Sequence, residues 1–153
     1  MSMIKRIEYL EKLKKWKDKN LIKVVTGIRR CGKSTLLELF IEHLKEEKID
    51  EEHIVSINLE SLEYNFSNYK DLYFYVVSKI KDDKKYYLFL DEIQNIEEFQ
   101  KAVDSLYIKK NIDIYITGSN ALLLSGELAT LLTGRYVEIK MLPLSFKEYV
   151  SAF

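Results

Sequence analysis

Apolar residues recur along the chain in two patterns, short continuous runs and longer stretches with helical spacing, and the two patterns alternate. Runs rich in β-branched and aromatic residues predict strands, whereas apolar residues three and four positions apart predict helices with one buried face. Strands are predicted at 22–26, 53–60, 86–90, 112–116 and 136–141. Helices are predicted at 3–19, 33–48, 68–80, 95–109 and 121–132, and another opens at 145.

This alternation predicts the fold class. Strands that are separated by helices form a parallel sheet with helices on both faces, so we expect a three-layer α/β domain with a central five-stranded sheet. Polar and apolar residues alternate in IVSINL at 54–59 and in VEIKM at 137–141, which indicates half-exposed edge strands. The continuous apolar runs VV at 24–25 and YYLFL at 86–90 suit central strands.

The same patterns predict details of single helices. The first helix is expected to bury one apolar stripe, with Trp16 as a core anchor; the stripe is Met3, Ile7, Leu10 and Leu13. Asn95 followed by Glu98 fits a capping box at the start of the fourth helix. His43 and His53 have no partner at metal-ligand spacing, and we expect both on the surface.

The segment after the first strand has the spacing of a phosphate-binding loop. Gly27, four further residues, Gly32, Lys33 and Ser34 fit G-x-x-x-x-G-K-[ST] between a predicted strand and helix. Glycines let backbone N–H groups approach phosphate oxygens, and the helix directs its positive end at them. Lys33 adds a charge at the outer phosphates, and the Ser34 hydroxyl is the expected Mg²⁺ ligand. The predicted nucleotide-binding residues are Gly27, Ile28, Arg29, Arg30, Cys31, Gly32, Lys33, Ser34 and Thr35.

A pair of acidic residues follows the third strand. Asp91 comes directly off an apolar run, as does the carboxylate that holds the magnesium hydration shell in such sites, and it is the second predicted metal residue. Glu92 is the candidate base that orients an attacking water, with Lys33 as its catalytic partner at the phosphates. The alternative is a solvated acidic pair at a strand end.

Polar residues also follow the fourth strand. One of Thr117, Ser119 and Asn120 would reach the terminal phosphate or the attacking water, and their spacing does not decide which. Arg135 follows a Thr-Gly break, and it is either a transition-state arginine, acting in cis or from a neighbour, or part of a surface salt bridge. The chain has no Asn-Lys-x-Asp guanine-reading motif, so ATP with Mg²⁺ is the expected ligand.

Composition narrows the classes of partner. The 24 basic and 24 acidic residues give a formal net charge of zero, so bulk charge does not support nucleic-acid binding, although a local basic face is not excluded. Cys31 is the single cysteine, which favours a reducing compartment. No apolar run approaches the roughly 18 residues of a membrane-spanning helix, and the N-terminus has no apolar signal core. We therefore expect a cytoplasmic protein without a membrane partner.

The combined motifs resemble a prokaryotic family of AAA-like ATPases, in which an N-terminal ATPase domain precedes a C-terminal domain of uncharacterised function. The resemblance runs from about Val24 to Tyr149. It rests on GIRRCGKST at 27–35, DEIQ at 91–94, TGSN at 117–120, LTGR at 132–135 and LPLSFKEY at 142–149. It implies the additional-strand P-loop fold with strand order 5-1-4-3-2, ATP bound at Lys33 and Ser34, and the acidic roles of Asp91 and Glu92 given above.

The expected organisation is an N-terminal helix packed on the core (1–20), an ATPase core (21–144), and the start of a helix (145–153) that leads to a further domain. The expected function is a Mg-dependent ATPase that drives a conformational change in an attached domain or a protein partner. The alternatives are a nucleotide-gated switch or scaffold with little turnover and a small-molecule kinase. Self-association into a homo-oligomer is a further expectation.

Overall fold

A single parallel sheet forms the middle layer of the domain. The computed structural model describes residues 3–28, 32–119 and 132–142, with side chains from residue 7 onward. Five strands lie in the order β2-β3-β4-β1-β5, and every neighbouring pair is parallel. The strands are β1 Ile22–Thr26, β2 Ile54–Asn58, β3 Tyr86–Asp91, β4 Ile112–Gly118 and β5 Tyr136–Lys140. This confirms the predicted three-layer α/β fold and its strand order.

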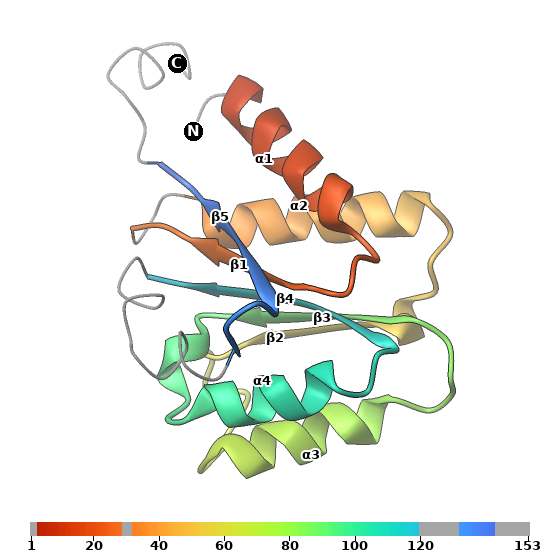
Figure 1. Ribbon diagram of the computed structural model, residues 1–153, viewed down its shortest axis with the longest axis vertical. Helices are drawn as coiled ribbons and strands as arrows, with labels where there is room; N and C mark the ends of the chain where they lie inside the picture. Colours follow the sequence, from red (N-terminus) through yellow and green to blue (C-terminus); the bar gives the residue numbers. More distant parts are fainter. Residues whose placement is uncertain (1–2, 29–31, 120–131, 143–153) are drawn as a thin grey trace.

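Helices cover both faces of the sheet. α1 and α2 lie on one face and α3 and α4 on the other (Figure 1). Two short 3₁₀ turns, η1 and η2, adjoin strands β2 and β3. The bounds are α1 Met3–Trp16, α2 Lys33–Glu46, η1 Glu51–His53, α3 Tyr69–Lys79, η2 Ile93–Asn95 and α4 Phe99–Tyr107. No helix within the described ranges is long and apolar enough to cross a membrane.

The strands differ in burial as their positions require. All residues of β1, β3 and β4 are buried, because both of their faces are covered and both of their edges are paired. β2 alternates between buried and more exposed residues, and Ile139 is the single buried residue of β5; both strands lie at the edges of the sheet, which confirms the prediction.

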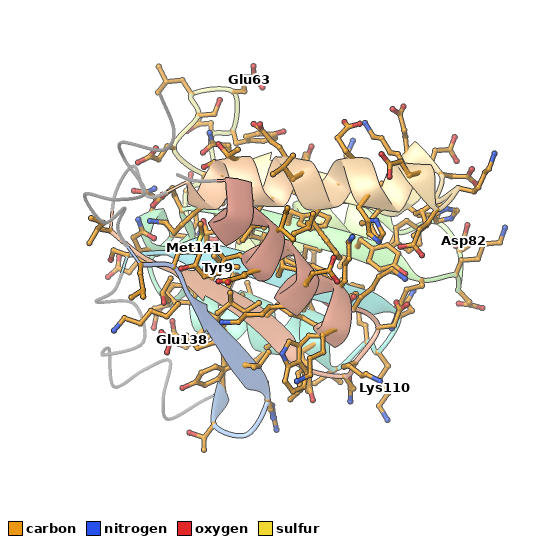
Figure 2. All side chains as sticks on the ribbon, turned by 90° about the horizontal axis from the view of Figure 1, so that it is seen from above. Tyr9, Glu63, Asp82, Lys110, Glu138 and Met141 are labelled. Atoms are coloured by element: carbon orange, nitrogen blue, oxygen red, sulfur yellow. The ribbon has the colours of Figure 1, made fainter. Side chains whose placement is uncertain are left out.

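The predicted apolar stripe of α1 is confirmed at Leu13, which is buried, and at Leu10, which packs against the same core, but not at Ile7. Ile7 is 52% exposed, whereas Tyr9 and Leu13 are buried against α2 and β5. Tyr9 lies beside Met141 (Figure 2), and its hydroxyl accepts a hydrogen bond from the backbone N–H of Leu142 at 3.0 Å. This polar contact favours Tyr9 at the buried position. Trp16 is only partly buried and packs against Lys15, so its assignment as a core anchor was wrong.

The segment after β3 corrects the predicted capping box. Asn95 ends the η2 turn, and α4 begins only at Phe99, after Glu98 in a left-handed conformation. The cause is that Ile93 and Ile96 are buried and anchor a separate turn, while the Asn95 amide donates to the Glu92 carbonyl.

The predicted surface position of His53 is also wrong, because its buried ring packs edge-on against Tyr86 and contacts Asp82.

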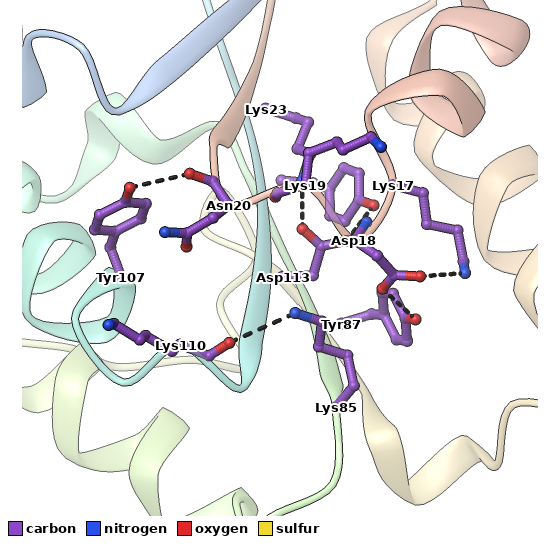
Figure 3. A network of polar contacts seen from close by, with 11 residues as sticks. Lys17, Asp18, Lys19, Asn20, Lys23, Lys85, Tyr87, Tyr107, Lys110 and Asp113 are labelled. Atoms are coloured by element: carbon purple, nitrogen blue, oxygen red, sulfur yellow. Dashed lines mark hydrogen bonds and ion pairs between the residues drawn. The ribbon is translucent and has the colours of Figure 1, made fainter.

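A buried ion pair joins the two central strands at their amino ends. Lys23 of β1 contacts Asp113 of β4, and both side chains are almost completely buried (Figure 3). Asp113 also accepts hydrogen bonds from the Tyr115 hydroxyl at 2.7 Å and from the backbone N–H of Asp18 at 3.0 Å. The Lys23 ammonium donates to the Lys19 carbonyl at 2.8 Å. Because these partners satisfy both charges, the pair is compatible with burial.

The ionisation of the surrounding groups follows from this pair. Burial lowers the pKa of Lys23, and the Asp113 carboxylate opposes that shift. Burial and the same carboxylate raise the pKa of Tyr115 well above its ordinary value, so its hydroxyl remains a donor. Asp18 accepts hydrogen bonds from Lys17 and Tyr87, both at 2.7 Å, which extends the network to β3.

We expect Lys23→Met to destabilise the fold strongly. The substitution leaves the Asp113 carboxylate buried without its cation, which costs about 3–5 kcal/mol in the free energy of unfolding. Urea unfolding followed by circular dichroism measures this loss. Lys84→Met, at an exposed position, is the control. Adding Asp113→Leu to Lys23→Met should restore part of the stability, and a loss below about 1 kcal/mol for Lys23→Met would show that the pair behaves like a surface one.

Candidate nucleotide-binding site

The predicted site residues gather at the carboxyl edge of the sheet. Parallel strands end at the same edge, and the strands β1, β4 and β3 are neighbours in that order. The loop that begins at Gly27 follows β1, Asp91 ends β3, and Thr117 lies next to the end of β4. Topology therefore brings together segments that lie far apart in the sequence.

The end of the loop is shaped by Gly32. This residue precedes α2 with φ 98°, a left-handed conformation that side chains disfavour. Its carbonyl accepts the N–H of Leu36 at 2.9 Å and so begins the helix. The first N–H groups of a helix have no partner within it, so the start of α2 is suited to an anion.

Lys33 folds back across the loop. Its ammonium donates to the carbonyls of Gly27 at 2.7 Å and Ile28 at 3.1 Å, and the residue is only 4% exposed. Within the described part of the chain, no carboxylate contacts this ammonium. A buried cation held by neutral carbonyls is favourable for binding an anion, because an anion would balance its charge.

Ser34, Asp91 and Thr117 form a chain of hydrogen bonds. The Ser34 hydroxyl donates to one carboxylate oxygen of Asp91 at 2.6 Å. The Thr117 hydroxyl donates to the other, and in turn accepts the backbone N–H of Glu92 at 2.9 Å. Thr117 is fully buried, so its hydroxyl is committed to the acidic pair and is not directed at a phosphate.

Glu92 lies beside the loop. It is half-buried, and with Gly32, Lys33, Ser34 and Thr35 it lines a hollow of about 240 Å³. The hollow therefore has a cation, a hydroxyl and a carboxylate on its wall. The Gln94 amide donates to the Glu92 carboxylate at 2.5 Å. Sequence reasoning missed Gln94 as a site residue, and its only signal was its place in the DEIQ motif.

The other predicted residues of the phosphate loop, and those after β4 that were expected to reach the terminal phosphate, have the following positions. Ile28 is 47% exposed at the start of the loop. Ser119 is half-buried directly after β4. Arg29, Arg30, Cys31 and Asn120 lie outside the described residues. With Thr117 committed to the acidic pair, Ser119 and Asn120 remain as the candidates for contact with a terminal phosphate.

Arg135 is not brought to the loop. It directly precedes β5, and its carbonyl accepts the N–H of Ile22 at 2.7 Å, so it lies at the amino edge of the sheet. A strand of this length separates the two edges by about 16 Å. Its guanidinium pairs with Asp104 and packs over the Tyr107 ring. Of the predicted roles, this geometry matches the salt bridge; contact with a neighbouring subunit's nucleotide stays a prediction.

The donor atoms of the site fit magnesium. The Ser34 hydroxyl and the Asp91 carboxylate supply hard oxygen donors, and Mg²⁺ prefers few protein oxygens together with water and phosphate. Among the residues that the structure describes, no group of three or more His, Cys, Asp or Glu could hold a metal ion. The Ser34 hydroxyl and the Asp91 carboxylate, which lie between the loop and β3, are the residues that could hold Mg²⁺.

A strand, a Gly-Lys-Ser loop, a helix and an aspartate on a nearby strand define a P-loop nucleotide-binding domain. The chain belongs to the AAA domain family, whose match covers residues 19–150. This confirms the resemblance to AAA-like P-loop ATPases, and it supports a nucleotide-binding, ATPase-like role.

Relatives extend beyond this domain. An uncharacterized protein of Haemophilus influenzae is 48% identical over 99% of this chain and 38% of its own length. An uncharacterized protein of Methanocaldococcus jannaschii is 36% identical over 86% of this chain and 28% of its own length. The chain thus spans about a third of the length of these curated relatives.

Solved structures share the fold at low sequence identity. A chain from a structure of Drosophila ORC bound to DNA superposes with a TM-score of 0.61 and 13% identity, covering 99% of this chain and 97% of that one. A second, from Drosophila ORC bound to AT-rich DNA and Cdc6, has a TM-score of 0.60 and 14% identity, over 98% of this chain and 59% of that one. At these identities the similarity concerns the fold alone.

We expect Thr117→Val to destabilise the protein by about 1–3 kcal/mol, because it leaves buried polar groups of Asp91 and Glu92 without a partner. Chemical unfolding measures the loss. Thr26→Val is a matched control at the end of β1, where the hydroxyl donates only to the exposed Glu138 at 2.7 Å. Equal losses for the two variants would argue against a special role for Thr117.

Proposed function

We propose that the protein binds ATP with Mg²⁺ and hydrolyses it to ADP and phosphate. The observation that carries this proposal is the 2.6 Å contact between Ser34 and Asp91 beside the buried Lys33 ammonium. The Lys33 ammonium, which could bind phosphate, and the oxygens of Ser34 and Asp91, which could bind a metal, therefore adjoin the same hollow.

In the proposed complex, the phosphates lie against the amides of Gly27 to Thr35 and the start of α2. The Lys33 ammonium turns from the carbonyls of Gly27 and Ile28 to the outer phosphates. Ser34 and Asp91 would hold Mg²⁺, which when bound neutralises charge on the phosphate oxygens. Adenine is favoured over guanine because the guanine-reading motif is lacking in the sequence.

Hydrolysis requires a group that orients water. Glu92 lines the same hollow as Lys33 and Ser34, so its carboxylate is the base that we assign. Asp91 differs from Glu92 in being engaged by both Ser34 and Thr117, which suits it to the metal rather than to the water.

The use of the ATP energy lies beyond this site. Because the chain spans about a third of its relatives' length, we propose that hydrolysis changes the conformation of an attached domain or of a protein partner. The domain bounds, a homo-oligomer and the cytoplasmic location stay predictions.

We expect Glu92→Gln to lower the turnover number for ATP by about 10²–10⁴-fold, because it removes the base while keeping the shape of the side chain. Steady-state phosphate release measures turnover, and calorimetry should show that MgATP still binds. Glu97→Gln, an exposed carboxylate nearby, is the control.

Two outcomes would change the proposal. If Glu92→Gln turns over ATP as fast as the parent, Glu92 is not the base. If the parent binds MgATP tightly but releases almost no phosphate, the chain is a nucleotide-gated switch or scaffold, the alternative class.

We expect MgATP to protect Cys31 from alkylation, because this single cysteine lies within the phosphate loop and bound phosphates would cover it. Mass spectrometry after a timed iodoacetamide pulse measures labelling with and without nucleotide. Lys33→Ala is the matched control, since loss of the ammonium weakens MgATP binding and should abolish protection. Equal labelling of the parent with and without MgATP would contradict binding at this loop.

A further inference from the structure

Glu92 has an unfavourable backbone conformation for its residue type. Its φ is 58° and its ψ is 53°, in the left-handed region that glycine adopts readily and glutamate does not. Such strain persists only where surrounding contacts determine the conformation, and it occurs frequently at functional sites. The contacts around Glu92 therefore carry information about what its side chain does.

Three side chains hold Glu92 at three different groups. The Thr117 hydroxyl accepts its N–H at 2.9 Å. The Asn95 amide donates to its carbonyl at 3.1 Å. The Gln94 amide donates to its carboxylate at 2.5 Å. The first two contacts fix the backbone, whereas the third acts on the carboxylate itself.

Gln94 has no role in the core that would explain this contact. Its neighbour Ile93 is fully buried and anchors the η2 turn, whereas Gln94 is exposed. Water could satisfy an exposed amide equally well, so folding does not demand that it contact a carboxylate. Its contact is instead with Glu92, the carboxylate that, among the residues the structure describes, lines the hollow beside Lys33 and Ser34.

We propose that Gln94 is a positioning residue, which holds the Glu92 carboxylate at the phosphate loop in the orientation needed to align the attacking water. The inference rests on the proposed ATP hydrolysis and deepens it. Thr117 and Asn95 set the backbone of Glu92, and Gln94 restricts the remaining freedom of its side chain. The amide donates to the carboxylate and leaves the other oxygen available to water.

Gln94→Ala should therefore lower the turnover number without weakening nucleotide binding. Gln94 is not one of the residues that line the hollow, so the KM for ATP should stay within about twofold of the parent. A misoriented base should lower the turnover number by about tenfold. Glu97→Gln again serves as the control for an exposed side chain in the same segment.

The decisive experiment is a double-mutant cycle of the parent, Gln94→Ala, Glu92→Gln and the double variant. If Gln94 acts through Glu92, Gln94→Ala costs about tenfold in the parent and nothing further in the Glu92→Gln background. Equal factors in both backgrounds, or no effect of Gln94→Ala in the parent, would overturn the inference.

Failure of the hydrolysis proposal gives a different result. If Glu92→Gln is fully active, the base assignment fails, whatever Gln94→Ala does. If the parent has no turnover, a cycle of Glu92→Ala and Gln94→Ala on the urea unfolding midpoint tests the contact itself. If the two substitutions change the urea midpoint non-additively, the contact of Gln94 with Glu92 is supported. If their effects on the midpoint simply add, the inference is overturned. Glu92→Gly should unfold at a higher midpoint than Glu92→Ala, because glycine relieves the left-handed strain.

Discussion

The hydrogen bonds to the Asp91 carboxylate are the interaction on which the site depends. Ser34 reaches one oxygen from the start of α2, and Thr117 reaches the other from the end of β4. Asp91, at the end of β3, thus connects the start of α2, just after the phosphate loop, to β3 and to β4. Because Thr117 also accepts the N–H of Glu92, the positions of the candidate metal ligand Asp91 and of the candidate base Glu92 are coupled.

A different kind of contact, a buried ion pair, joins the strands at their amino ends, on the side of the sheet away from the phosphate loop. Lys23 and Asp113 pair between β1 and β4, and backbone groups of the α1–β1 connection complete their hydrogen bonding. A charge pair without correct partners is costly in a core, so it disfavours other registers of these strands. β1 is thus paired with β4 along its length and fixed to it by this ion pair at the amino end, and the phosphate loop follows directly from that strand.

The layers and the edge strands could be predicted because alternation and apolar runs depend on local sequence, whereas the strand order came from the resemblance to the AAA-like family. The loop and Asp91 could also be predicted, since their spacing reflects phosphate and metal chemistry. The sequence could not reveal that the Thr117 hydroxyl donates its hydrogen bond to Asp91, because the two residues lie 26 positions apart in the chain. Asn95 followed by Glu98 is typical of a helix N-cap, but the burial of Ile93 and Ile96 favours a separate turn at this position.

The pairing of β1 has a consequence for how the chain folds. Its two neighbours in the sheet are β4 and β5, which come last among the strands. The contact of Lys23 with Asp113 spans 90 residues, and that of Thr26 with Glu138 spans 112. Closing such long segments is entropically costly and slow. During synthesis β1, which carries the phosphate loop, is therefore made before the other four strands, and its two native neighbours, β4 and β5, are the last of the five to follow.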